Sequence, residues 1–185
     1  SAQDMILDKL PPQNLEAEMA TLGSMLLDEE AVSIASEKLD ASCFYNDAHR
    51  KIFQAISDLY NANKAVDLIT LTDALKKDNS LDAIGGASFL TSLANAVPTA
   101  ANINHYASIV REKYILRTLI NNSTKIITVC HESQGNIAEV VDTAEKLIFE
   151  VSDRKNQGSY QHLKEIVKDS IETIDKLYQN KAHVT

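Results

Sequence analysis

The feature that most restricts the fold is a long segment, from Asn102 to Glu132, that contains no glycine or proline. Those two residues are the ones that most often interrupt a helix. Large side chains recur along the segment at intervals of three and four residues, the spacing of one helix face. The positions on this face are Ile103, Tyr106, Val110, Tyr114, Arg117 and Ile120. The segment therefore predicts one continuous helix about 45 Å long.

A second helix is predicted after a short break. The residues Ser133, Gln134 and Gly135 end the first helix, and Asn136 with Glu139 has the spacing of a capping box. Apolar positions then resume at helical spacing: Ile137, Val140, Val141, Ala144, Leu147, Ile148 and Val151. Two long helices joined by a short turn predict an antiparallel helical hairpin over residues 98–155.

The predicted hairpin has more apolar surface than its two helices can cover for one another. A second copy of the chain is the expected partner, since identical surfaces can pair around a two-fold axis. The expected interface residues are Ile103, Tyr106, Val110, Tyr114, Arg117, Val140, Ala144 and Leu147. The alternative is that the hairpin packs against the N-terminal half of its own chain.

Residues 11–97 predict a compact globular head of short helices. Strand signals are almost absent, so the fold class expected for the whole chain is all-α. Residues 1–10 are expected to be a disordered lead-in. Asn14 suits a helix N-cap with Glu16 and Glu18 in the first turn, and Thr70 with Asp73 resembles a short capping box.

The C-terminal end predicts a separate element. Residues 156–161 are polar and contain glycine, which indicates a flexible linker. Residues 162–185 then predict an amphipathic linker helix that cannot bury its apolar stripe alone. The expected docking residues are Leu163, Ile166, Val167, Ile171, Ile174 and Leu177. The chain stops without a closing cap, which we interpret as a sign of truncation.

The net charge of -8 is carried by the first half of the chain, which includes the head. Residues 1–97 hold 7 basic and 15 acidic side chains, whereas residues 98–155 hold 7 of each. Binding to duplex DNA requires clustered lysine and arginine. The acidic head therefore indicates a basic protein partner, or serves only solubility.

No pattern for catalysis stands out. The sequence has no phosphate-binding GxxxxGK[ST] loop, no HExxH and no CxxC, so no cofactor or metal is expected. His49 is expected to be a surface or capping histidine. The two cysteines exclude a disulfide scaffold. No run of eighteen apolar residues exists, so no membrane partner is expected.

Six motifs in the same order resemble the N-terminal part of the bacterial DnaB-type replicative DNA helicases. The similarity extends over about residues 11–185. The motifs are PPQNLEAE at 11–18 leading into LGSMLLD at 22–28, FY at 44–45 with HRKIF at 49–53, VDLITL at 66–71, GGASFL at 85–90, PTAAN at 98–102 with YASIVRE at 106–112, and LKE at 163–165 with the terminal VT at 184–185.

The resemblance implies the N-terminal collar of a hexameric helicase, with the linker helix leading toward an ATPase domain that this sequence lacks. It implies self-association through hairpins, from dimer to hexamer, and recruitment of primase and the helicase loader at the replication fork. ATP, magnesium and single-stranded DNA would then belong to the missing domain, so this fragment would not itself be an enzyme. The expected location is the bacterial cytoplasm, at the nucleoid.

Two alternatives remain open from the sequence. The module itself could bind single-stranded DNA through Tyr106, Tyr114 and Arg117, because aromatic and cationic side chains on one face can stack on bases. The other alternative, an independent enzyme, has no residue constellation to support it.

Overall fold

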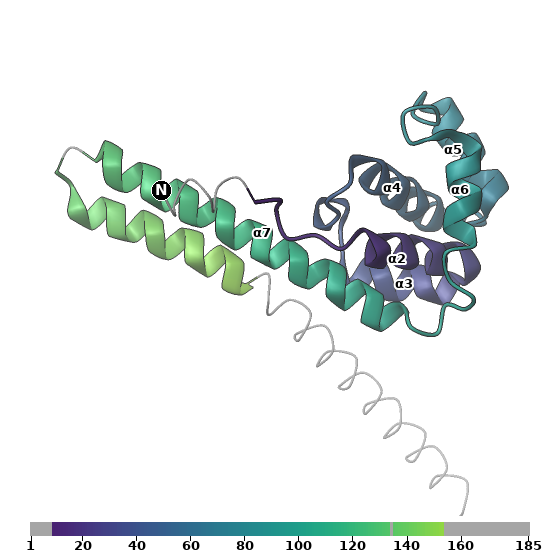
Figure 1. The fold of residues 1–185 in the computed structure, drawn as a ribbon, viewed down its shortest axis with the longest axis horizontal. Helices are drawn as coiled ribbons and strands as arrows, with labels where there is room; N and C mark the ends of the chain where they lie inside the picture. Colours follow the sequence, from purple (N-terminus) through teal and green to yellow (C-terminus); the bar gives the residue numbers. More distant parts are fainter. Residues whose placement is uncertain (1–8, 134, 154–185) are drawn as a thin grey trace, which may run out of the picture.

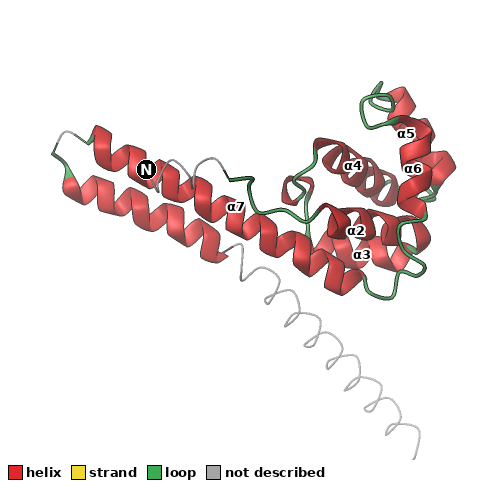
Figure 2. Cartoon of the chain, viewed as in Figure 1, coloured by secondary structure: helices red, strands yellow, loops and turns green. Residues whose placement is uncertain are grey.

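The computed structural model describes residues 9–133 and 135–153. Every regular element within them is helical, which confirms the all-α prediction (Figure 2). The elements in chain order are α2 (Leu15–Leu27), α3 (Glu29–Lys38), the 3-10 helix η1 (Ala41–Cys43), α4 (Asp47–Asn61), α5 (Leu68–Lys77), α6 (Gly86–Ala94), α7 (Ile103–Glu132) and a helix at residues 137–153. The expected linker at 156–161 and linker helix at 162–185 lie outside the described residues.

Side-chain caps begin the head helices where the sequence supplies short polar residues. The side chain of Asn14 accepts from the Ala17 amide at the start of α2. Asp28 and Asn46 accept in the same way at the starts of α3 and α4. These bonds satisfy amides that have no partner inside the helix, so each cap fixes where its helix begins.

The capping box of α5 lies three residues earlier than the sequence suggested. Asp67 is the N-cap, and its side chain accepts from the amides of Ile69 and Thr70. Thr70 completes the box by accepting from the Asp67 amide. The predicted pairing of Thr70 with Asp73 is therefore wrong. Asp73 instead lies inside α5 and pairs with Lys77, with 2.6 Å between carboxylate and ammonium.

The helices α2 to α6 gather at one end of the molecule and enclose the core (Figure 1). The largest fully buried side chains come from different helices and from the loop at residue 44, and they meet there. They include Leu22, Met25, Phe44, Ile52, Ile56, Leu71, Leu75, Leu90 and Leu93. The head is thus a small helical domain with a single hydrophobic core.

The helix α7 belongs to both parts of the molecule. Its first turns complete the head, because Ile103, Ala107 and Val110 are buried in the same core as α2 and α3. Its second half leaves the head and runs beside helix 137–153 in an antiparallel hairpin (Figure 1). The expected division at residue 98 therefore does not separate two cores, since one rigid helix connects them.

A short turn closes the hairpin. Gly135 has a φ of 106°, a conformation that glycine adopts at little cost. The amide of Glu139 donates to the Asn136 side chain at 3.3 Å, so Asn136 caps helix 137–153 as the sequence predicted. Because the turn is short, the two helices lie side by side and antiparallel.

Candidate interaction surface

The predicted interface residues at the start of α7 are covered by the head of their own chain. Ile103 is 3% exposed and Val110 is 2% exposed. Tyr106 is half-buried beside them. A partner cannot reach Ile103 and Val110 while the head is folded on α7. This is the arrangement that the alternative prediction anticipated, and it applies to the first half of the helix.

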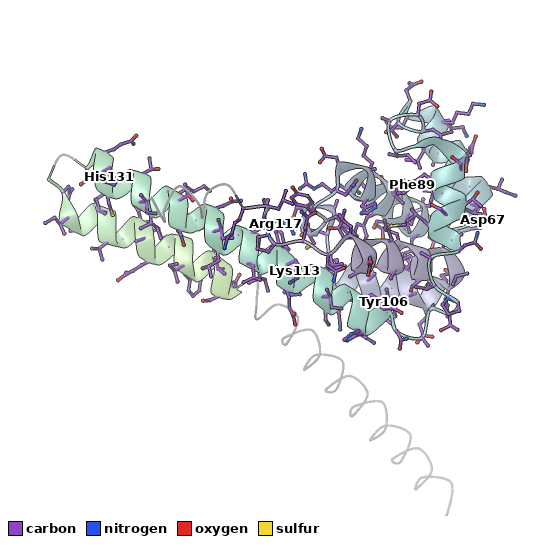
Figure 3. All side chains as sticks on the ribbon, viewed as in Figure 1. Asp67, Phe89, Tyr106, Lys113, Arg117 and His131 are labelled. Atoms are coloured by element: carbon purple, nitrogen blue, oxygen red, sulfur yellow. The ribbon has the colours of Figure 1, made fainter. Side chains whose placement is uncertain are left out.

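Arg117 lies where α7 leaves the head, as Figure 3 shows. Its guanidinium donates to the carbonyl of Pro12 and to the carbonyl of Cys43, both at 2.7 Å. It also lies over the rings of Tyr45 and Tyr114, 5.5 and 5.9 Å from their centroids. Burial is the largest cause that lowers the pKa of Arg117. The residue therefore ties three segments of the chain together.

Tyr114 is also used within the chain. Its hydroxyl accepts from the Ser42 hydroxyl at 3.2 Å, and its ring packs against the core of the head. Cys43, in the same loop, is 4% exposed, and burial raises the pKa of its thiol to about 11. The sequence did not indicate how strongly the loop at residues 39–46 is held against α7.

A buried polar network lies behind this loop. Glu18 is 1% exposed, and its carboxyl oxygens lie 2.6 Å from the Tyr45 amide, 3.3 Å from the Asn46 amide and 2.6 Å from Nδ1 of His49. His49 is 2% exposed, and its ring stacks on Phe89 with 5.9 Å between centroids. The prediction of a surface or capping histidine is therefore wrong, because the Glu18 carboxyl provides a buried partner for the ring.

The predicted residues on the second hairpin helix lie toward α7. Val140, Ala144 and Leu147 are half-buried. Asn122 of α7 is 3% exposed, and its Nδ2 donates to the Leu147 carbonyl at 2.8 Å. These residues form the contact between the two helices of the hairpin. The sequence offered no signal for Asn122, because an asparagine inside a helix usually faces solvent.

Beyond the head, each helix of the hairpin carries a row of exposed apolar side chains. On α7 the row has exposed fractions between 38% and 58%, and on helix 137–153 between 43% and 76%. We call these residues the apolar hairpin face: Leu116, Leu119, Ile120, Ile127, Ile137, Val141 and Ile148. None of them was in the predicted interface, because helical spacing shows which residues share a face but not which face is left uncovered.

Both rows lie on the same side of the hairpin. A helix turns by about 100° per residue. The row on α7 therefore lies about 120° around the helix from Asn122, and the row on helix 137–153 lies about 100° around from Leu147. Each row lies at a positive angle from the contact between the helices, counted in the direction of its own sequence. Because the two helices run in opposite directions, these two turns point to the same side of the hairpin. The hairpin thus presents one continuous apolar surface.

The opposite side of the hairpin is mostly polar, and Phe149, which is 70% exposed, is the large apolar side chain near it. Lys146 and Asp142 form an ion pair there, with 2.8 Å between Nζ and Oδ2. All of the following side chains on that side are exposed: Asn121, Lys125, Thr128, Glu132, Glu139, Asp142, Lys146 and Glu150. An exposed apolar surface with a polar opposite side is typical of a protein–protein contact.

Within residues 9–133 and 135–153, no three His, Cys, Asp or Glu side chains are grouped so that they could hold a metal ion. His131 lies near the hairpin turn, away from the head (Figure 3). Among the helices that the structure describes, none has the length and apolar character to cross a membrane.

Comparison with known proteins gives consistent matches. The family model described as the DnaB-like helicase N terminal domain matches residues 10–112. The replicative DNA helicase DnaC of Bacillus subtilis (strain 168) is 41% identical over 182 residues, which are 98% of this chain and 40% of that protein. The replicative DNA helicase DnaB of Geobacillus stearothermophilus is 40% identical, with the same coverage. The chain thus spans about 40% of the length of these relatives.

Solved structures share the fold. The crystal structure of the N-terminal domain of DnaB helicase from Mycobacterium tuberculosis has a TM-score of 0.72 and 42% identity, and covers 77% of this chain and 99% of that one. A structure of a DnaB-like replicative helicase, described with its interactions with primase, has a TM-score of 0.62 and 24% identity. It covers 76% of this chain and 31% of that one, and it supports the fold alone.

Proposed function

Because this chain belongs to the family of DnaB-like helicase N-terminal domains, we propose that it is an assembly module of a replicative DNA helicase. In this proposal the apolar hairpin face packs against the same face of a second copy. The observation that carries the proposal is the exposure of that face along both helices. Leaving so much apolar surface in water is unfavourable, and burial returns about 25 cal/mol per Å².

A second copy suits the surface for a further reason. Residues 98–155 hold equal numbers of basic and acidic side chains, so two hairpins do not repel one another through net charge. A two-fold contact would bring the apolar face of one copy onto that of the other while both polar sides stay in water. Further contacts would extend such dimers to a hexamer. The residues Ile103 and Val110 stay out of this interface because the head covers them.

The remaining parts of the proposal concern the longer protein. Its ATPase domain would use ATP and magnesium to move along single-stranded DNA, in the cytoplasm at the nucleoid. The module would recruit primase and the helicase loader, and one of the family's solved structures is described with primase. The linker helix would dock on a neighbouring subunit through Leu163, Ile166, Val167, Ile171, Ile174 and Leu177, which lie outside the described residues.

The alternative in which the module binds single-stranded DNA has less support. It depended on Tyr106, Tyr114 and Arg117 being free to stack on bases. Arg117 donates to two backbone carbonyls, and Tyr114 packs against the head. Base stacking would have to replace these internal contacts.

The assembly proposal predicts that a charge on the apolar hairpin face weakens self-association. Ile127 is 58% exposed, so Ile127→Asp should leave the helix folded. Burying the new carboxylate between two copies is costly, and the apolar contact is lost as well. We expect the dimer dissociation constant of residues 1–185, measured by sedimentation equilibrium, to rise at least tenfold.

The matched control is Thr128→Asp, one residue along α7 and on the polar side of the hairpin. It adds the same charge to the same helix, and we expect it to associate like the parent chain. Equal dissociation constants for the parent chain and the Ile127→Asp variant would contradict the proposed interface.

A further inference from the structure

Helix 137–153 has more apolar surface than α7 can cover. Apart from Phe149, its apolar side chains larger than alanine lie within an arc of about 120° around the helix. They form two adjacent rows. The inner row is Val140, Leu147 and Val151, and the outer row is Ile137, Val141 and Ile148. Ala144 lies between the two rows.

Composition alone does not select which row faces α7. Each row consists of three aliphatic side chains of similar size, so either could pack against α7. A rotation of the helix by about 80° about its axis would bring the outer row to α7 in place of the inner row. That rotation would bury Ile137, Val141 and Ile148 within the chain and remove three of the seven residues of the apolar hairpin face.

Asn122 distinguishes the two arrangements. It is a polar residue at 3% exposure in an otherwise apolar contact, and its Nδ2 donates to the Leu147 carbonyl at 2.8 Å. A buried amide without a partner is costly. The carbonyl has a fixed place on the surface of its helix, so the bond forms at only one rotation and one position along the axis.

The same bond aligns the helices lengthwise. Asn122 lies twelve residues before Gln134, and Leu147 lies twelve residues after Gly135, so the pair is equidistant from the turn. This alignment places Ile120 within one residue of the level of Ile148, and Ile127 within one residue of the level of Val141. The two rows therefore form one surface rather than two staggered ones.

We propose that Asn122 is a positioning residue that sets the rotation of helix 137–153 and so keeps Ile137, Val141 and Ile148 on the outside of the hairpin. It acts through the Leu147 carbonyl and does not itself touch a partner. A single buried polar side chain is known to select one packing arrangement among similar apolar ones, at some cost in stability. Its effect on assembly rests on the proposed function, but its effect on the rotation does not.

The rotation can be measured with thiols introduced at one position of each row. In a Cys130→Ser background, Val141→Cys reports the outer row and Leu147→Cys the inner row. The alkylation rates of the two thiols by iodoacetamide are measured in residues 1–185, below the concentration at which the chain associates. Cys43 is buried and adds a slow background that is subtracted with the Cys130→Ser chain.

Adding Asn122→Leu removes the amide while keeping a side chain of similar size. We expect the ratio of outer to inner alkylation rates to fall at least fivefold, which corresponds to about 1 kcal/mol. Asn122→Ala should lower the ratio in the same direction. The matched control is Asn121→Leu, the neighbouring asparagine on the polar side, and it should leave the ratio unchanged.

Two outcomes would overturn the proposal. One is a rate ratio within twofold of the parent in both Asn122 variants. The other is an equal acceleration of both thiols, which would mean that Asn122 only stabilises the hairpin. In the chain without introduced thiols, Asn122→Leu should also weaken self-association. If the parent chain does not self-associate at all, the proposed function fails, and the rate ratio still decides the role of Asn122.

Discussion

At the scale of single residues, charged side chains hold the loop at residues 39–46 in place by binding backbone groups in it and beside it. Glu18 accepts hydrogen bonds from two backbone amides of the loop at residues 39–46. Arg117 donates to a backbone carbonyl of the same loop. Arg50 donates to the Phe44 carbonyl at 2.7 Å, and Arg111 donates to the Lys38 carbonyl at the start of the loop. Because buried backbone groups need partners, these side chains replace the hydrogen bonds that a regular helix would provide.

Glu18 should therefore be the most sensitive polar residue of the head. Glu18→Gln preserves the shape of the side chain but replaces one accepting oxygen with a donating NH₂ group. That group would face a backbone amide or the His49 ring, leaving buried polar atoms without partners. We expect the free energy of unfolding, measured with urea by circular dichroism, to fall by about 3 kcal/mol.

Glu16→Gln is the control for this experiment. It removes the same charge from the first turn of the same helix, but Glu16 is exposed. Its loss should cost about 0.5 kcal/mol through the helix dipole. If the two variants unfolded at the same urea concentration, the network around Glu18 would contribute no more to the free energy of unfolding than the exposed charge of Glu16.

The sequence placed Glu18 in the first turn of a helix but did not predict its role in the buried network. Glu18 and Glu16 are equivalent by their position in a first helical turn, and only the fold brings His49 and the loop amides to one of them. The same holds for His49, whose burial depends on the Glu18 carboxyl. Contacts between residues far apart in sequence leave no local pattern from which they could be predicted.

At the scale of elements, helical periodicity was the most reliable guide. The absence of glycine and proline from 102 to 132 predicted a helix that the structure places at Ile103–Glu132. The turn after it and the Asn136 cap followed from local chemistry in the same way. Periodicity did not show that α7 changes partner along its length. It therefore grouped Ile103 and Val110, which face the head, with positions in the hairpin.

The packing of α2 against α6 gives a prediction at this scale. The two helices approach so closely that a Cβ atom at Gly23 would lie 2.4 Å from the Leu93 carbonyl oxygen. Alanine favours a helix over glycine by about 1 kcal/mol, but here it must push a backbone atom of the neighbouring helix away. Overpacking of this kind typically costs about 1–3 kcal/mol.

We therefore expect Gly23→Ala to lower the thermal midpoint of the head. Ser36→Ala serves as the control, because Ser36 is an exposed position of α3 where alanine gains helix propensity without a clash. A midpoint for Gly23→Ala equal to or above that of the parent chain would show that α2 and α6 are not in close contact.

At the scale of the whole molecule, the chain is a helical head with a hairpin that extends away from it (Figure 1). The resemblance noted in the sequence is confirmed by the family model over residues 10–112. The head has a closed core, whereas the hairpin leaves an apolar side open to water. This difference indicates that the hairpin is the part of the molecule that needs a partner, and in our proposal that partner is a second copy.

The mass of residues 1–185 in solution, measured by light scattering across a concentration series, tests this claim most directly. If the apolar hairpin face is covered by a second copy, the mass at high micromolar concentration will be at least twice the 20.4 kDa of one chain, and it will decrease on dilution. A mass of 20.4 kDa at every concentration would contradict the claim.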